Sequence, residues 1–340
     1  MASLSSSGPR GNPLRRRLNG FQKVALATTI ATYLLIMVGG FVRAAGAGLG
    51  CPDWPKCFGY WLPPAEASQI AAKGFDPALF NPTLMWIEYG NRMIGVLVGF
   101  LILATTVVAY RHHRQVGRIF WPTVAAFGLV LFQGWLGGKV VEFDLAGWIV
   151  TVHLILALVI VILLLYATVC AFFPGGKPLP VIPPERQTIA RMGQALVGLG
   201  LVQLTLGALV RGHIDDIASK TGLPRAEWVG QVGTFDHLHR AGALVLTLAV
   251  LAVAFSVVRQ RDLHPWLRRT AWTMAGLVLV QVAAGIGLAY AALPPPLQTI
   301  HIVVGTLLIG AFTLLVLLAY RLPVGNVSQR EPGLPATSPA

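Results

Sequence analysis

Charged residues are scarce in this chain of 340 residues. Asp, Glu, Lys and Arg make up 11% of the sequence, whereas 55% of the residues are hydrophobic and the mean hydropathy is +0.68. A soluble domain carries about 25% charged residues. The shortage of charge therefore excludes an ordinary soluble protein and predicts an integral membrane protein.

Several nucleotide- and metal-binding motifs are also missing. The sequence has no GxGxxG fingerprint, no Walker loop and no zinc-finger spacing, and Asp215-Asp216 stands alone where a prenyl transferase would need an Asp-rich diphosphate motif. The net charge is +13, but the basic residues occur in short clusters between apolar runs. Such clusters are typical of membrane-topology signals. No nucleic-acid partner is predicted.

Cysteine is rare as well. Two of the three cysteines, Cys51 and Cys57, lie in one short loop with five residues between them, and Cys170 falls within an apolar run. The spacing is not that of a Cys-x-x-Cys redox motif or a zinc knuckle. In an oxidising compartment it allows a disulfide that closes a small loop, either structural or redox-active; the alternative is a pair of free thiols. Cys170 is expected to serve packing.

Eight apolar segments are each long enough to cross roughly 30 Å of hydrocarbon as a helix. Lys and Arg gather in alternate connections, which predicts that both termini are cytoplasmic and that the more acidic connections face outward.

Residues 1–20 are rich in Ser and Arg and contain no acid. They could be a transit or signal region, but a retained basic tail is favoured because the next segment matches one in the second half. The predicted helices cover about 21–43, 85–110, 118–141, 147–173, 190–211, 236–258, 267–290 and 297–320.

The sequence repeats itself after four predicted helices. The pattern acid-x-x-(His or Asn)-Arg occurs at 88–92 and again at 236–240, and 148 residues also separate His153 from His301 and Gln133 from Gln281. Four is an even number, so both halves insert with the same orientation and are related by an axis along the membrane normal. The fold class predicted is an all-α membrane protein of two tandem four-helix bundles with pseudo-twofold symmetry. Its divisions are a cytoplasmic basic tail 1–20, an N-terminal bundle 21–175, a cytoplasmic linker 176–189, a C-terminal bundle 190–321 and a disordered cytoplasmic tail 322–340.

Two histidines of the second half, His239 and His301, are predicted to share one depth in the membrane, because each lies roughly one to two turns after the outer start of its helix. Ionisable residues inside a bilayer are costly and usually mark a function. Two imidazoles at equal depth on facing helices are typical of bis-imidazole ligation of a haem iron. A copper or zinc site is the alternative, but zinc would need further ligands. His237 lies about 200° round the helix from His239, and it and His213 are expected at the membrane interface.

The first half differs at one of these positions. Asn91, a poor iron ligand, stands where the second half has His239. His153 alone could hold an iron and leave its other side weakly ligated or open, and axial ligands decide whether a haem pocket favours electron transfer or chemistry. The sequence thus suggests an electron-transfer site in the second half and a reactive site in the first. Glu88, one turn before Asn91, could exchange protons there; the alternative is an ion pair with Arg92.

Polar residues near these sites have two interpretations each. Gln133 and Gln281 are predicted level with His153 and His301, where each could hydrogen-bond the non-ligating imidazole nitrogen or simply join neighbouring helices. Four arginines at outer helix ends could bind haem propionates through charge-assisted hydrogen bonds or meet lipid headgroups. They are Arg43, Arg92, Arg211 and Arg240.

Together these features resemble the haem A synthase family of respiratory membranes over roughly residues 21–321. The resemblance rests on residues 39–43, the Cys51/Cys57 loop, and residues 86–95, 151–153, 239–240 and 299–301. It implies that the C-terminal bundle holds haem b through His239 and His301. It also implies that the N-terminal bundle receives haem O and oxidises a porphyrin methyl group, through an alcohol, to the formyl group of haem A. The product would supply cytochrome c oxidase.

The resemblance further implies residue roles and partners. The family's essential glutamate maps to Glu88 and its outer cysteine pair to Cys51 and Cys57. Its first-half ligands map to Asn91 and His153, where this chain departs from the usual Glu-x-x-His-Arg pattern. The implied partners are haem O synthase and cytochrome c oxidase assembly factors, in the lipid of the cell membrane. The electron partner is not indicated, and a homo-oligomer is left open.

Two other classes of protein compete with this enzyme. A non-enzymatic di-haem b cytochrome, passing electrons to or from quinone, would need two ligated low-spin haems, which Asn91 disfavours. A transporter built on parallel repeats would use the His and Glu side chains as a proton relay and would carry no haem.

Overall fold

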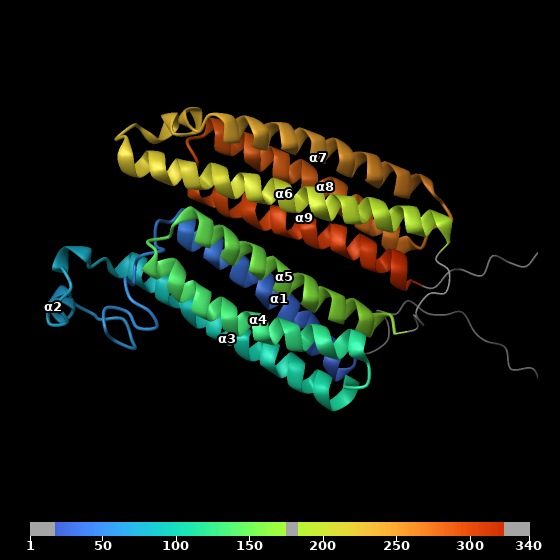
Figure 1. The fold of residues 1–340 in the computed structure, drawn as a ribbon, viewed down its shortest axis with the longest axis horizontal. Coiled ribbons are helices and arrows are strands. Elements are labelled where there is room, and N and C mark those ends of the chain that lie inside the picture. Colours follow the sequence, from blue (N-terminus) through green and yellow to red (C-terminus); the bar gives the residue numbers. More distant parts are fainter. Residues whose placement is uncertain (1–17, 175–182, 323–340) are drawn as a thin grey trace, which may run out of the picture.

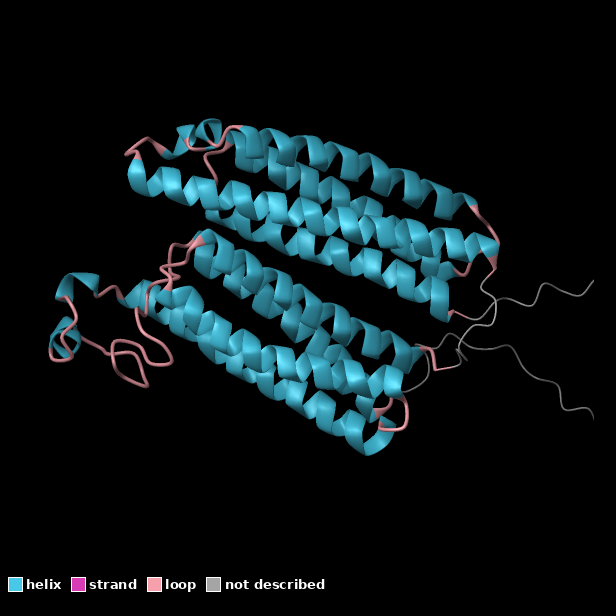
Figure 2. Cartoon of the chain, viewed as in Figure 1, coloured by secondary structure: helices cyan, strands magenta, loops and turns pink. Residues whose placement is uncertain are grey.

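The computed structural model describes residues 18–174 and 183–322, which form helices and loops and no strand (Figure 2). Eight of the helices are long and apolar enough to cross a membrane, which confirms the predicted all-α membrane fold. All of the predicted tail 322–340 except Leu322 and most of the predicted tail 1–20 lie outside the described residues, as does the first part of the predicted linker 176–189. The eight long helices are α1 (Gly20–Ala44), α3 (Pro82–His113), α4 (Gly117–Glu142), α5 (Gly147–Phe172), α6 (Pro184–Lys220), α7 (Thr234–Arg259), α8 (Pro265–Tyr290) and α9 (Pro295–Arg321).

Local sequence explains where these helices begin. Asn19 caps α1, with its side chain accepting a hydrogen bond from the Gln22 backbone N–H at 2.8 Å, and Asn81 caps α3 in the same way. These caps satisfy backbone N–H groups that have no partner inside the helix. Proline occupies the first helical turn of α3, α6, α8 and α9, where its missing N–H costs nothing.

The predicted fifth span, 190–211, was too short, because α6 runs over 37 residues from Pro184 to Lys220. The prediction followed only the apolar run. The polar end continues as helix because Arg211 pairs with Asp215 at 2.8 Å and Lys220 with Asp216 at 3.5 Å, both one turn apart. In the first half, by contrast, α1 stops at Ala44, just before Gly46 adopts a positive φ of 71°. The two halves therefore differ most at this end.

The long helices pack as two groups of four (Figure 1). Within the first group, contacts run from α1 to α3, α4, α5 and back to α1, and within the second from α6 to α7, α8, α9 and back to α6. Contacts between the groups join α1 with α9, α5 with α9 and α5 with α6. If α1 is exchanged with α6 and α5 with α9, the same three contacts are obtained. The arrangement is therefore consistent with the predicted tandem bundles and their twofold relation.

Apolar side chains on the outside of the groups suit a lipid environment. Phe100 is 64% exposed, Leu248 59% and Trp272 64%. In a soluble protein such exposure along every long helix would be costly, whereas in a bilayer these side chains face hydrocarbon. The short elements all lie in two connections: α2 (Ala67–Ala71) and the 3₁₀ helix η2 (Pro77–Leu79) between α1 and α3, and η3 (Arg225–Glu227) and η4 (Val229–Gln231) between α6 and α7.

Candidate functional site

The second group of helices brings His239 and His301 together. His239 lies on α7 and His301 on α9, which are diagonally opposite in their group. The centres of the two imidazole rings are 6.3 Å apart, and the ring planes are inclined at 68°. Helices that are diagonal in a four-helix bundle face each other across its core, where side chains from both can share a cofactor.

Each of these imidazoles has a glutamine amide beside it. Gln281 on α8 places its amide nitrogen 3.2 Å from His301 Nε2, as the sequence suggested. Gln203 on α6, which sequence reasoning missed, places its amide nitrogen 3.0 Å from His239 Nδ1 and donates to the His239 carbonyl at 2.7 Å. An amide side chain beside one ring nitrogen fixes the orientation of the ring, and a metal-bound imidazole donates its N–H on that side to an oxygen such as the amide carbonyl. The other nitrogen is left for a ligand, and in His301 that nitrogen, Nδ1, is buried without a partner.

Glycines make room for both imidazoles. A Cβ atom at Gly207 on α6 would lie 3.0 Å from His239 Cε1, and one at Gly285 on α8 would lie 3.2 Å from His301 Cε1. Each glycine follows its glutamine by four residues, so both stand on one helix face. The spacing Gln-x-x-x-Gly is present at 203–207, 281–285 and 133–137 but also at 194–198 and 329–333, so by itself it would not have singled out Gln203.

The second-half pair fits a haem iron. Metal–imidazole bonds are about 2 Å long and an imidazole nitrogen lies roughly 1 Å from its ring centre, so one metal between two rings separates their centres by about 6 Å. The observed 6.3 Å agrees with this value. Among residues 18–174 and 183–322, no group of three or more His, Cys, Asp or Glu side chains that could hold a metal ion is found. A closed zinc site needs four protein ligands, whereas a haem needs only the two axial ones.

Gly207→Ala is expected to weaken haem binding in the second half. The added Cβ would press on the His239 ring, and because Gln203 holds that ring from the same helix, the ring cannot retreat without loss of the 3.0 Å contact. Overpacking of this kind costs about 1–3 kcal/mol, which corresponds to a loss in affinity of roughly five- to 150-fold. Haem content of the purified protein measures it. Gly198→Ala on the same helix, where a Cβ meets nothing within 4 Å, is the control and should retain full haem content.

The first group of helices presents a different pair. Asn91 on α3 faces Gly39 of α1, where a Cβ would lie 4.0 Å from Asn91 Oδ1, and His153 on α5 faces Gly137 of α4, where a Cβ would lie 3.5 Å from the ring. Both Asn91 Oδ1 and His153 Nδ1 are buried without a hydrogen-bond partner. Gln133 donates at 2.6 Å to the His153 carbonyl oxygen. The suggested bond from Gln133 to the imidazole ring is therefore replaced by one to the main chain.

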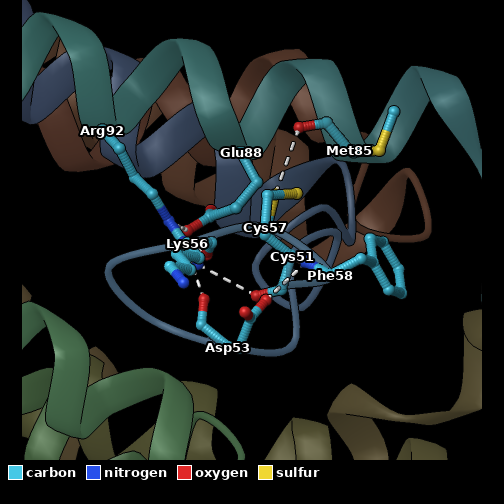
Figure 3. Close-up of polar contacts among 8 residues, drawn as sticks. All are labelled: Cys51, Asp53, Lys56, Cys57, Phe58, Met85, Glu88 and Arg92. Carbon is cyan, nitrogen blue, oxygen red and sulfur yellow. Dashed lines mark hydrogen bonds and ion pairs between the residues drawn. A yellow bond between two sulfur atoms is a disulfide. The ribbon is translucent and has the colours of Figure 1, made fainter. Parts of the chain in front are cut away.

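Glu88 lies one turn before Asn91 and is paired with Arg92. The Arg92 Nε donates to Glu88 Oε1 at 3.0 Å, and the two side chains are only 9% and 8% exposed (Figure 3). The ion pair considered as the alternative role for Glu88 is thus present. It does not exclude a proton-transfer role, because the second carboxylate oxygen makes no hydrogen bond recorded for the described residues.

Arg92 also binds the outer loop that follows α1. It donates to the carbonyl oxygens of Asp53 and Lys56, both at 2.8 Å, and of Cys51 at 2.9 Å. Four of the five N–H donors of the guanidinium are therefore engaged by this loop and Glu88, which leaves little capacity for the propionate contact suggested from sequence. Figure 3 shows the Glu88 and Arg92 side chains reaching from α3 toward the loop.

Cys51 and Cys57 form a disulfide, as the sequence predicted, with their Cα atoms 4.7 Å apart. Both cysteines are fully buried and pack in one cluster with Phe58, Ile70 and Met85. Asp53 stabilises the loop, since its carboxylate accepts hydrogen bonds from the backbone N–H groups of Phe58 and Gly59. The disulfide loop is thereby fixed directly beside Glu88.

The other candidate arginines pair with carboxylates. Arg43 of α1 and Arg211 of α6 both contact Asp215, at 2.7 and 2.8 Å, so one carboxylate joins the two groups of helices. Arg211 also donates to the Gln298 side chain. Arg240 pairs with Asp236 at 2.7 Å and remains 48% exposed. Arg43, Arg211 and Arg240 keep unengaged donors, and their suggested contact with propionates stays a prediction.

Fold and site together define a class: an integral membrane protein of eight spanning helices, with an imidazole pair in one half and an acid-flanked Asn and His in the other. The family model for cytochrome oxidase assembly proteins (COX15-CtaA) matches residues 22–313, and the chain belongs to this family.

Curated relatives agree over most of the chain. It is 26% identical to a protein named heme A synthase from Cereibacter sphaeroides, over 84% of this chain and 85% of that one. It is 26% identical to heme A synthase from Shewanella oneidensis (81% and 89%) and 28% identical to that from Symbiobacterium thermophilum (91% and 98%).

Proposed function

We propose that this chain is a haem A synthase. It takes haem O, oxidises a methyl group on the porphyrin ring through an alcohol to a formyl group, and releases haem A for cytochrome c oxidase. The observation that carries the proposal is the unequal pair of sites, with His239 and His301 at 6.3 Å in the second half and Glu88, Asn91 and His153 in the first, in a member of the cytochrome oxidase assembly family.

The second-half site is assigned to a resident haem b. His239 and His301 would hold this haem through its iron, and Gln203 and Gln281 would hold the two rings in place. Bound by two imidazoles, the group would supply electron-transfer chemistry there. The glycines Gly207 and Gly285 allow neighbouring helices to approach the rings closely.

The first-half site is assigned to the substrate porphyrin. His153 is the ligand, and Glu88 is the group that takes up or releases protons as the methyl carbon is oxidised, because a carboxylate in a low-dielectric site can act as a general base. Arg92 positions Glu88 through their 3.0 Å contact and ties this carboxylate to the disulfide loop. The bound haem b supplies the electron-transfer chemistry that a stepwise oxidation requires.

The membrane setting suits this substrate. A prenylated porphyrin is large and apolar, and a site between helices can admit it from lipid. The proposal includes the cell membrane as location, both termini in the cytoplasm, and the Cys51–Cys57 loop on the outer side, where an oxidising environment maintains the disulfide. Haem O synthase is the proposed source of substrate and cytochrome c oxidase assembly factors the proposed recipients of product.

Haem extraction after co-expression with a haem O synthase tests the function. The purified protein is expected to carry haem b, and haem A is expected to accumulate in the membranes and to be identified by chromatography of extracted haems. Protein that carries only unmodified haem, with no haem A formed, would instead support a di-haem cytochrome. Protein that carries no haem would support a transporter and refute the proposed enzyme.

A further inference from the structure

The two halves differ in how completely they surround an iron. In the second half both positions are histidines and both rings contact a glutamine amide. In the first half Asn91 stands at the position of His239, and Leu35 stands at the position of Gln203, 168 residues earlier in the chain. For the described residues, Gln133 donates to the His153 carbonyl oxygen and not to its ring, and the ring Nδ1 is buried without a partner.

We propose that the first-half site holds its porphyrin iron through His153 alone and keeps the position on the Asn91 side open to a small exogenous ligand. This inference rests on the proposed function and adds the coordination state of the substrate haem. A five-coordinate iron is high-spin and binds carbon monoxide when reduced, whereas the second-half haem, ligated on both sides, is low-spin and does not.

No other imidazole of the first half can complete the first-half site, and His213 of α6 is turned to Phe235, with the ring centres 4.7 Å apart. All eight histidines of the chain lie in the described residues. In the first half, besides His153, only His112 and His113 remain, and they lie 21 and 22 residues beyond Asn91 on α3. At 1.5 Å per residue this is about 30 Å along the helix, which places them at its other end.

Other donor types near the site are already engaged or face away. Cys51 and Cys57 are joined to each other, and the Tyr89 hydroxyl donates to the Trp61 carbonyl at 2.9 Å. Among the methionines of α1 and α3, Met37 is 38% and Met93 44% exposed, while Met85 is fully buried in the disulfide-loop cluster. Asn91 therefore remains as the polar group at the position equivalent to His239, with the Glu88 carboxylate one turn before it.

Asn91 suits an open position better than a ligated one. Its amide oxygen is a hard, neutral donor, which iron in a porphyrin binds weakly, and its NH₂ group can donate a hydrogen bond to a small ligand. Gly39 leaves space beside it, since a Cβ there would only touch Asn91 Oδ1 at 4.0 Å. A single axial bond also holds the porphyrin less firmly than two, which favours uptake of substrate and release of product.

Spectroscopy of the intact protein tests this coordination. Protein purified from cells that co-produce haem O is reduced and exposed to carbon monoxide, and its spin states are recorded by electron paramagnetic resonance in the oxidised form. The wild type is expected to show one low-spin haem that ignores carbon monoxide and one high-spin haem that binds it. A second haem that is low-spin and inert to carbon monoxide in the wild type would refute the inference but leave the proposed function standing. A complete absence of both a second haem and haem A would refute the function itself.

Two variants at one position sharpen the result. Asn91→His restores the second imidazole, so it is expected to convert the high-spin signal to low-spin and to abolish carbon monoxide binding. Asn91→Ala keeps the position open and should bind carbon monoxide as the wild type does. A high-spin Asn91→His protein, or an Asn91→Ala protein that no longer binds carbon monoxide, would show that Asn91 does not lie across the iron from His153.

Discussion

Replacement of His239 or His301 with Ala is expected to remove the resident haem b spectrum from the purified protein. The two imidazoles lie 6.3 Å apart on diagonally opposite helices and are the only pair of histidine rings in contact within the described parts of the chain. Loss of either leaves the iron with one protein ligand in a site built for two. The absorption spectrum of the reduced protein and the haem-to-protein ratio measure the effect.

A matched substitution separates ligand loss from misfolding. His237→Ala lies on the same helix two residues before His239, at an exposed position, and should keep the full haem spectrum. Retention of a normal haem b spectrum by both His239→Ala and His301→Ala would remove the ligand assignment and the electron-transfer half of the proposed function.

Glu88→Gln is expected to abolish conversion of haem O to haem A while haem b stays bound. Glutamine keeps the size of the side chain and can still accept the hydrogen bond from Arg92, but it cannot take up a proton. General acid–base catalysis typically contributes about 10²- to 10⁴-fold to a rate, and a loss of that size is expected. The ratio of haem A to haem O in extracts gives the turnover, and the reduced spectrum gives the haem b content.

Asp236 provides the control in the other half. It pairs with Arg240 at 2.7 Å across the same one-turn spacing, but it belongs to the second-half motif. Asp236→Asn should therefore reduce haem A formation far less than Glu88→Gln. Unchanged turnover in Glu88→Gln would leave Glu88 only as the partner of Arg92 that positions the disulfide loop.

The membrane fold and the imidazole pair could be predicted because their signals are strong. Long apolar runs, of which those in α5 and α9 have the two highest mean hydropathies among the described spans, have few structural interpretations. Histidines such as His239 and His301 stand out in those runs because burial of an ionisable group in lipid is costly. The internal repeat aligns the two halves with each other. The difference between Asn91 and its counterpart His239 could therefore be recognised from this sequence alone.

Other parts of the site had no comparable signal. Gln203 was missed because its first-half counterpart is Leu35, so comparison of the repeats could not select it. The contacts of Arg92 with the disulfide loop use backbone carbonyl oxygens of Asp53, Lys56 and Cys51. Every residue carries such an oxygen, and its position depends on the folded path of the loop. The extension of α6 to Lys220 was missed because polar residues there are stabilised by pairs along the helix and not by lipid.

The contacts between the two groups of helices have a consequence for how such a protein can be built. Since α5 meets α9, and the α1–α9 contact has α5–α6 as its equivalent, a single four-helix chain could form the same assembly as an isologous homodimer. Joining both copies in one polypeptide frees equivalent positions to diverge. Asp215 has Ala47 as its counterpart, so one carboxylate serves Arg43 and Arg211 where a homodimer would place two. In the proposed function, this divergence allows the second half to bind its porphyrin permanently while the first half exchanges its own.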